Sequence, residues 1–179
     1  TNYLYIPANE NLCGRMSGGT VVEYVPGQNF TRGTTASGSL STSHLREGRA
    51  NDHVGEVSAW DMATFERVWT HEFAASPNWG PILSTGGNLV FAGGTNDRKF
   101  RAFNATTGDL LWEIVTSSGI IGVPSSFEVD GKQYVSVQSG WGIDAAGMQG
   151  RLAGLLPDLY TPNAIQPVGG VIWTFALKD

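Results

Sequence analysis

An eleven-residue pattern occurs twice in the chain at an offset of 43 residues, and it restricts the possible folds more than any other feature. The copies run from Ala59 to Trp69 and from Ala102 to Trp112. Each copy begins with Ala and an aromatic residue, continues with Asp or Asn and a turn, and predicts a strand that closes on Trp. Units of roughly 40 to 50 residues with about four strands are typical of β-propeller blades, because one blade alone cannot bury both of its faces.

The rest of the chain also predicts an all-β fold. Short apolar or alternating runs are separated by turns rich in Gly, Asn and Asp, and no window has the sustained period of an amphipathic helix. Strands are expected at Val21–Val25, Gly55–Trp60, Asn88–Ala92, Lys99–Phe103, Leu110–Val115, Gln133–Gln138 and Gly170–Leu177. Two stretches, Gly27–Asp52 and Ala145–Pro167, lack this pattern. We expect long surface or cavity-lining loops there, with a disordered connector as the alternative.

Composition excludes several classes of protein. Charged residues make up 15% of the chain, the formal net charge is -5, and Lys and Arg do not cluster, so nucleic-acid binding is not expected. The chain has no run of 18 apolar residues, so no membrane-spanning helix is expected. The single cysteine, Cys13, cannot form an internal disulfide, and one Cys with three scattered His does not suit a zinc finger.

Two copies of the repeat are too few to close a propeller. Four units of this length would almost fill the 179 residues, but residues 1–50 and 145–168 do not repeat the pattern. The chain also opens on the alternating residues Tyr3–Ile6, as if inside a strand. Residues 1–179 are therefore predicted to be one segment of a single propeller domain, incomplete by itself and completed by an N-terminal portion or a partner chain.

The repeat resembles the tryptophan-docking motif Ala-x-Asp-x-x-Thr-Gly-x-x-x-Trp of the quinoprotein alcohol dehydrogenases, which depend on pyrroloquinoline quinone (PQQ). The second copy fits with Asn104 in place of Asp. The first copy has Phe65 in place of Gly, which predicts an altered turn. Other segments resemble the C-terminal region of the same family, namely Pro77–Gly80, Gly86–Phe91, Ser118–Pro124, Gly131–Val137, Ser139–Gly142 and Gly169–Leu177.

The resemblance implies a fold and a reaction. The family fold is an eight-bladed propeller with PQQ near its axis, of which this chain would supply the C-terminal blades. Members oxidise primary or secondary alcohols to aldehydes or ketones in the periplasm and pass electrons to cytochrome c or a quinone. A bound cation, Ca²⁺ or a lanthanide, polarises the quinone. The catalytic base and the metal ligands lie upstream of the matched region, so neither is expected in this chain.

The excursion at Ala145–Pro167 follows the Gly140–Gly142 turn directly and is expected to overhang the mouth of the active site. It contains both apolar and charged side chains. Such a mixed wall suits alcohols larger than methanol, with polyols and sugars as candidates.

Trp79 is the first candidate for contact with the cofactor. It follows Pro77 and Asn78 at the entrance to an expected strand, where the family places a Trp against PQQ, and it lies outside the repeat. The indole offers a large apolar face and one N–H donor, which suits a planar ligand that carries carboxylates. The alternative is a Trp that packs between blades, as expected for Trp69 and Trp112.

The turn Gly140–Asp144 is the second candidate. Family members have a Gly-Trp-Gly-Gly-like turn here, so Gly142 and Asp144 are expected near the cofactor and Trp141 in the substrate cavity. The sequence departs from the family at Ile143 and Asp144, and a carboxylate near a polycarboxylate ligand is unfavourable unless it is hydrogen-bonded or faces the cavity. Cavity lining or a simple turn is the alternative for Asp144.

A second function remains open at this stage. A non-catalytic propeller scaffold with PQQ-type repeats would share the fold, because fold alone does not imply function. Trp79 and Gly140–Asp144 distinguish the two, since a scaffold has no use for a Trp that faces a cofactor. A carbohydrate-binding β-protein would account for the aromatic residues but not for the repeat.

Overall fold

A computed structural model describes residues 2–10, 13–16, 23–27, 38–41, 53–73, 76–141, 153 and 169–176. This part of the chain contains twelve strands in four antiparallel sheets. Among these residues no helix is long and apolar enough to span a membrane. The strands are β1 Tyr3–Asn9, β2 Cys13–Met16, β3 Gly38–Ser41, β4 Gly55–Asp61, β5 Arg67–Phe73, β6 Ile82–Ser84, β7 Leu89–Ala92, β8 Lys99–Asn104, β9 Leu110–Val115, β10 Ser125–Val129, β11 Lys132–Ser139 and β12 Val171–Ala176.

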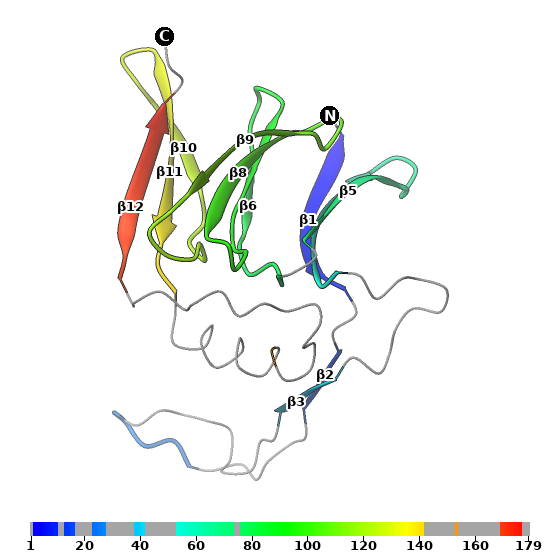
Figure 1. Cartoon of the computed structure of the whole chain (residues 1–179), viewed down its shortest axis with the longest axis vertical. Helices are drawn as coiled ribbons and strands as arrows, with labels where there is room; N and C mark the ends of the chain where they lie inside the picture. The colour runs from blue at the N-terminus through cyan, green and yellow to red at the C-terminus, as the bar shows by residue number, and fades with distance from the viewer. Residues whose placement is uncertain are drawn as a thin grey trace. The chain divides into compact units, whose positions relative to one another are not determined.

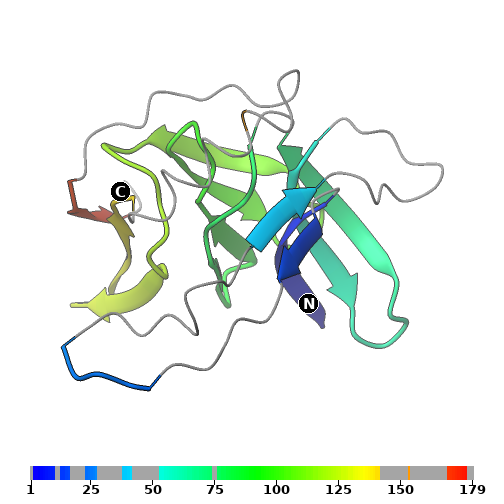
Figure 2. The same cartoon turned by 90° about the horizontal axis from the view of Figure 1, so that it is seen from below.

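The chain divides into two compact units. The smaller unit, Asn11–Ala50, contains the two-stranded sheet in which β2 pairs with β3. The larger unit comprises Thr1–Glu10 and Asn51–Asp179 and contains three sheets, with strand orders β1-β4-β5, β6-β7-β8-β9 and β10-β11-β12. Figure 1 and Figure 2 show these three sheets side by side, with the four-stranded sheet in the middle.

Two apolar clusters hold the three sheets together. In β7, Val90 contributes to the cluster against β1-β4-β5, and the next residue, Phe91, contributes to the cluster against β10-β11-β12. Phe103 and Phe100 in β8 divide in the same way, and both are fully buried. Because successive side chains of a strand point to opposite faces, the middle sheet is buried on both sides, as expected of stacked propeller blades.

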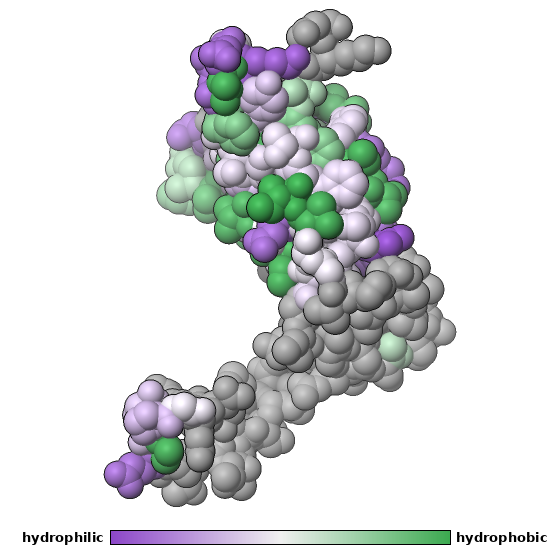
Figure 3. All heavy atoms as spheres, turned by 90° about the vertical axis from the view of Figure 1, so that its left-hand side faces the viewer, coloured by the Kyte–Doolittle hydropathy of each residue, from purple (hydrophilic) through white to green (hydrophobic). Residues whose placement is uncertain are grey.

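The outward face of the sheet β10-β11-β12 remains partly apolar. Phe127 stacks on Tyr134 across the strand pair, with ring centroids 5.5 Å apart, and Ile172 is 73% exposed. Figure 3 shows apolar side chains on this side of the described part of the larger unit.

Each copy of the repeat folds into a strand, a tight turn and a second strand. Ala59 lies opposite Trp69 in the pair β4–β5, and Ala102 lies opposite Trp112 in the pair β8–β9. The predicted strand Leu110–Val115 is confirmed, whereas the second strand of the first copy does not close on Trp69 as its pattern predicted. Each Trp is the third residue of its strand, because the cross-strand pairing continues beyond it, to Phe73 in β5 and Val115 in β9.

Trp69 packs across the gap between two sheets onto the second copy of the repeat. Its indole Nε1 donates a hydrogen bond to the carbonyl oxygen of Ala105 (3.0 Å), and its ring stacks on Phe103 with centroids 6.5 Å apart. A Cβ atom at Gly108 would lie 2.6 Å from Cδ2 of Trp69, so only Gly lets the turn approach the ring this closely. Trp112 contacts Phe175 in β12 of the third sheet edge-on, with centroids 5.2 Å apart.

The prediction that Phe65 alters the first turn is also wrong. The N–H of Phe65 donates to the carbonyl of Asp61 at 2.9 Å, and Gly108 donates to Asn104 at the same distance. The side chain of Asp61 accepts bonds from the N–H groups two and three residues further (2.7 and 3.3 Å), and Asn104 does the same (2.9 and 3.3 Å). Both residues have a left-handed backbone, with φ angles of 59° at Phe65 and 79° at Gly108. The hydrogen bonds of the turn therefore outweigh the strain that a side chain causes in this conformation.

Four strands lie where no strand was expected. Gly38–Ser41 lies inside the stretch predicted to be a long loop, and it pairs with Cys13–Met16. Ile82–Ser84 and Ser125–Val129 are too short or too rich in Ser for a clear alternating pattern, and their partner strands decide their conformation.

The expected strand at Val21–Val25 is wrong where it can be checked. Residues 23–25 form no strand, and residues 21 and 22 lie outside the described residues. The stretch Ala145–Pro167 lies outside them too, except for Ala153.

We predict that Gly108→Ala destabilises the intact protein by about 2 to 3 kcal/mol, because the methyl group adds a clash with Trp69 to the cost of a left-handed residue. Gly131→Ala is the matched control: its φ is 76° and a Cβ there would meet nothing within 4 Å. The control should cost only about 1 kcal/mol. Denaturant unfolding measures both, and equal losses would mean that the Trp69 contact contributes nothing.

Candidate functional site

Trp79 and Trp141 lie at the same end of the sheets, opposite the repeat turns. The antiparallel pairing places the end of β1, the start of β4 and the end of β5 at this edge. Backbone hydrogen bonds hold the connecting segments here: the backbone N–H of Trp79 donates to the carbonyl of Gly94, beyond the pair β6–β7, and that of Gly140 donates to the carbonyl of Gly119 (2.9 and 2.7 Å). The two candidate tryptophans therefore come from one edge of the larger unit.

The backbone of Trp79 is held by close contact between two glycine-containing segments. Trp79 and Gly80 run directly beside Gly93 and Gly94, in the connection between β7 and β8. A Cβ atom at Gly80 or Gly94 would collide with backbone atoms of the other segment. Glycine is thus required on both sides of the contact that fixes the position of Trp79.

The indole of Trp79 differs from the docked indole of Trp69. The side chain of Trp79 is half-buried, and its Nε1 is buried without a hydrogen-bond partner among the described residues. An unsatisfied buried donor is costly, and in native proteins it usually has an explanation such as a ligand or a bound water. The assignment of Trp79 to a cofactor stays a prediction, and this free donor is what would serve it.

Two asparagines that sequence reasoning did not single out hold the segment before Trp79. Asn78 is 5% exposed, its Nδ2 donates to the carbonyl of Glu56 (3.0 Å), and its Oδ1 accepts from Gly80 N–H (3.2 Å). Asn9, at the end of β1, bonds both the N–H and the carbonyl of Asn78 (2.8 and 3.1 Å). The motif Pro-Asn-Trp-Gly was the available signal for Asn78. No sequence signal pointed to Asn9, because the contact spans 69 residues.

Trp141 is buried against Gly119. The Trp side chain is 6% exposed, and a Cβ atom at Gly119 would overlap its ring. The backbone N–H of Trp141 donates to Oγ of Ser118 (3.2 Å), and the backbone N–H of Ser118 donates to Oγ of Ser139 (3.0 Å). Buried hydroxyl groups therefore anchor the turn that carries Trp141.

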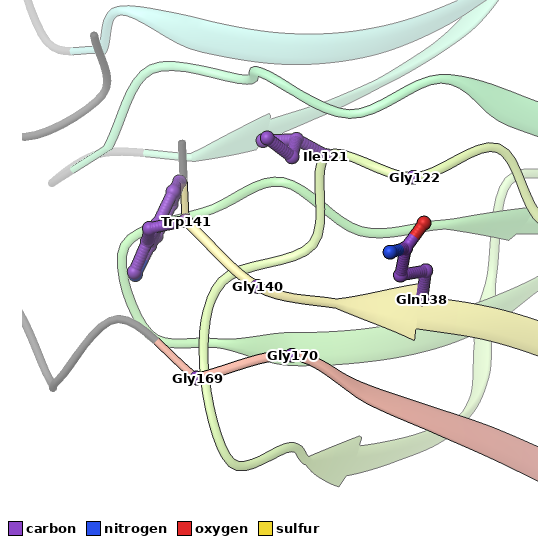
Figure 4. Close-up of a pocket in the computed structure, with 7 residues that line it drawn as sticks. All are labelled: Ile121, Gly122, Gln138, Gly140, Trp141, Gly169 and Gly170. Carbon is purple, nitrogen blue, oxygen red and sulfur yellow. The ribbon is translucent and has the colours of Figure 1, made fainter. Parts of the chain in front are cut away.

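A pocket of about 430 Å³ lies beside Trp141, as Figure 4 shows. Trp141 and Gln138 lie on opposite sides of it, and most of the remaining lining is backbone. The lining residues are Ile121, Gly122, Gln138, Gly140, Trp141, Gly169 and Gly170. The predicted role of Trp141 in a substrate cavity stays a prediction, and the pocket is compatible with it. Gly142 and Asp144, the other two predicted cofactor residues, lie outside the described residues.

The charged groups around Arg101 form a hydrogen-bonded network. Arg101 is buried, donates to Thr95 (2.8 Å) and Asp97, and lies over the ring of Phe73 at 5.1 Å. Burial opposes ionisation of Asp97, but the Thr95 hydroxyl and the Arg101 guanidinium hold its pKa below the usual range. These groups satisfy one another and therefore serve the packing of the sheets.

Metal ligands do not gather among the described residues. No group of three or more His, Cys, Asp or Glu side chains in that part of the chain is arranged to hold an ion. His53 Nε2 lies 3.5 Å from a carboxylate oxygen of Glu56, and Arg67 Nη1 lies 3.7 Å from the same oxygen, so Glu56 pairs with Arg67 rather than with a metal ion.

Comparison with known proteins identifies relatives of this chain. Residues 73–135 match the family described as glucose/ethanol/alcohol dehydrogenase, β-propeller domain. The quinoprotein alcohol dehydrogenase PedH of Pseudomonas putida is 44% identical over 126 residues, which are 70% of this chain and 20% of that protein. A 1-butanol dehydrogenase (cytochrome c) of Thauera butanivorans is 37% identical over 128 residues, 72% of this chain and 16% of that protein.

A solved structure shows the same architecture. A europium-containing methanol dehydrogenase superposes with a TM-score of 0.68 and 29% sequence identity over 98% of this chain and 31% of its own. The predicted fold class, part of a β-propeller, is confirmed. The chain spans about a fifth of the length of PedH, so most of that relative has no counterpart in it.

We predict that Asn78→Ala costs about 2 to 3 kcal/mol of stability, because it leaves the buried carbonyl of Glu56 and the buried N–H of Gly80 without their hydrogen-bond partner. Gln133→Ala is the control: Gln133 is exposed, its Nε2 donates to the exposed hydroxyl of Ser126 (2.8 Å), and its loss should change stability by less than about 0.5 kcal/mol. Denaturant unfolding of the intact protein measures both variants. A loss for Asn78→Ala as small as the control's would contradict the role of this network.

We also predict a pH-dependent contribution from His71. Burial, reinforced by the nearby positive charge of Arg101, lowers its pKa in the folded protein below 6.5, against opposing effects of Glu113 and Glu72. The unfolded chain therefore binds the proton first, and stability falls as the pH drops through about 6.5. His71→Gln should weaken the pH dependence of the unfolding midpoint below this pH. An unchanged dependence would contradict the prediction.

Proposed function

Because this chain is homologous to the quinoprotein alcohol dehydrogenases and contains part of a PQQ-family β-propeller, we propose that it is the C-terminal part of an eight-bladed quinoprotein that oxidises alcohols to aldehydes or ketones. The observation that carries this proposal is the free indole N–H of Trp79. It is buried, it lies outside the docking repeat, and hydrogen bonds to three separate segments hold its backbone and its neighbour Asn78 in place.

We propose that the residues at this end of the sheets hold PQQ. Trp79 would donate its N–H to an oxygen of the ligand, and its ring would cover part of the planar face and exclude water from it. When bound, PQQ supplies the two-electron acceptor for alcohol oxidation. Trp141 would line the substrate side, with Gly142 and Asp144 completing the cofactor contacts as the sequence predicts. The tight Gly80–Gly94 contact would keep the Trp79 backbone from yielding to the ligand.

The remaining chemistry is proposed to come from the rest of the whole protein. A Ca²⁺ or lanthanide ion would polarise the quinone, and the europium in the name of the similar methanol dehydrogenase supports a lanthanide as one candidate. The metal ligands and the catalytic base would lie in the N-terminal portion of the propeller. This division follows from the resemblance of the matched region to the family's C-terminal part.

Substrate, electron acceptor and compartment follow from the resemblance as well. We propose primary or secondary alcohols larger than methanol as substrates, including polyols or sugars, since a mixed apolar and charged segment follows Trp141 in the sequence. Cytochrome c is the proposed acceptor, supported by the name of the Thauera butanivorans relative, with a quinone as the alternative. The proposed compartment is the periplasm.

We predict that Trp79→Phe weakens PQQ binding about tenfold, because it keeps a smaller aromatic face and removes the N–H donor, a loss of about 1.4 kcal/mol. Titration of the metal-loaded intact protein with PQQ, followed by absorption and fluorescence quenching, measures the Kd. Trp112→Phe is the control, and it should lower stability while leaving the Kd unchanged. Equal affinity in Trp79→Phe would assign Trp79 to packing. Absence of PQQ binding in the unmodified protein would favour the scaffold function.

A further inference from the structure

The turn that carries Phe65 is the place where a further sheet would dock, and its side chain restricts what can dock there. In the observed pair of sheets, the Trp of one repeat packs onto the turn of the next repeat along the chain, as Trp69 packs onto Gly108. The corresponding partner of Phe65 would be the sheet that precedes β1-β4-β5. This inference rests on the proposed function only in that the chain is part of a longer propeller.

The two turns have the same backbone geometry, so their side chains can be compared directly. Asp61 and Asn104 make equivalent hydrogen bonds within their turns, and Phe65 and Gly108 share the left-handed conformation. The Cβ atom of Phe65 therefore occupies the position at which a Cβ of Gly108 would lie 2.6 Å from the docked indole. Carbon atoms in contact are normally about 3.5 to 4.0 Å apart, so the first turn has no room for a Trp docked as Trp69 is.

The Phe65 ring itself is positioned to fill that place. It is 75% exposed in the described structure, the most exposed of the large apolar side chains there, and it lies on a turn held by its own hydrogen bonds. A left-handed Phe costs about 1 to 2 kcal/mol relative to Gly. The hydrogen bonds of the turn offset this cost, and burial of the ring in the assembled protein would add stability that Gly could not provide.

We infer that the sheet preceding β1-β4-β5 docks on this turn without a tryptophan. At the position equivalent to Trp69 it carries a small or aliphatic residue, and the Phe65 ring supplies the aromatic volume from the opposite side. The interface thus exchanges the large and small partners of the Trp69–Gly108 contact.

Unfolding of the intact natural protein tests the inference. Phe65→Asn removes the ring and keeps a residue that tolerates the left-handed conformation, so it should lower Tm by several degrees through lost packing alone. Asp130→Asn is the control, because Asp130 has a φ of 52° at a turn on the same end of the sheets and should leave Tm unchanged. An unchanged or raised Tm for Phe65→Asn would overturn the inference.

Two further measurements keep the inference testable if Phe65→Asn fails to fold. Hydroxyl-radical footprinting of the unmodified protein should find Phe65 protected, whereas oxidation as fast as in the unfolded protein would overturn the inference. A Trp at the Trp69-equivalent position of the preceding repeat should destabilise the protein with Phe65 present and be accommodated in Phe65→Gly. A natural Trp at that position, or additive effects of the two substitutions, would also overturn it.

These outcomes are independent of the cofactor. The Phe65 turn lies at the end of the sheets opposite Trp79, so PQQ affinity should stay unchanged in Phe65→Asn. Failure of the unmodified protein to bind PQQ would count against the proposed function and leave the unfolding and footprinting results interpretable.

Discussion

The contact between Trp69 and the turn of the next sheet fixes how the sheets β1-β4-β5 and β6-β7-β8-β9 are arranged. Apolar faces alone attract each other without direction and would allow one sheet to slide on another. The hydrogen bond from Trp69 Nε1 to Ala105 and the close approach of Gly108 are directional, and they set both the spacing and the offset of the two sheets. The apolar cluster between the two sheets then packs at the spacing and offset that this contact sets.

The two ends of the sheets have different tasks. The repeat turns and the docked indole of Trp69 lie at one end, and the segments that carry Trp79 and Trp141 lie at the other. Strands of four to eight residues separate the two ends of the three sheets by about 15 to 25 Å, apart from the short β6. At both ends glycine allows the backbone to come close to a neighbouring group: Gly108 lies under the ring of Trp69, and Gly80 contacts Gly94 beside Trp79. The residues that dock one sheet on the next and the residues of the candidate site therefore lie at opposite ends of the same sheets.

Local patterns predicted the regular parts of this fold well. Gly55–Asp61, Lys99–Asn104 and Leu110–Val115 were recognisable because the repeat and the turn residues punctuate them. Ser125–Val129 was not, because its Ser residues have little preference for a strand and its pairing with β11 decides its structure. The turn at Phe65 was also not predicted correctly from its local sequence, because the hydrogen bonds of Asp61 preserve a backbone geometry that the Phe side chain disfavours.

The order of residues was enough to establish the repeat and the all-β class and to select Trp79 as a candidate, because periodicity and turn chemistry are local properties. It could not show that Asn9 holds Asn78, that Gly94 supports Trp79 or that the Trp79 N–H lacks a partner. These facts depend on residues far apart in the chain, which meet only when the sheets stack. The distinction between a docked tryptophan and one with a free donor therefore belongs to the folded protein and not to the motif.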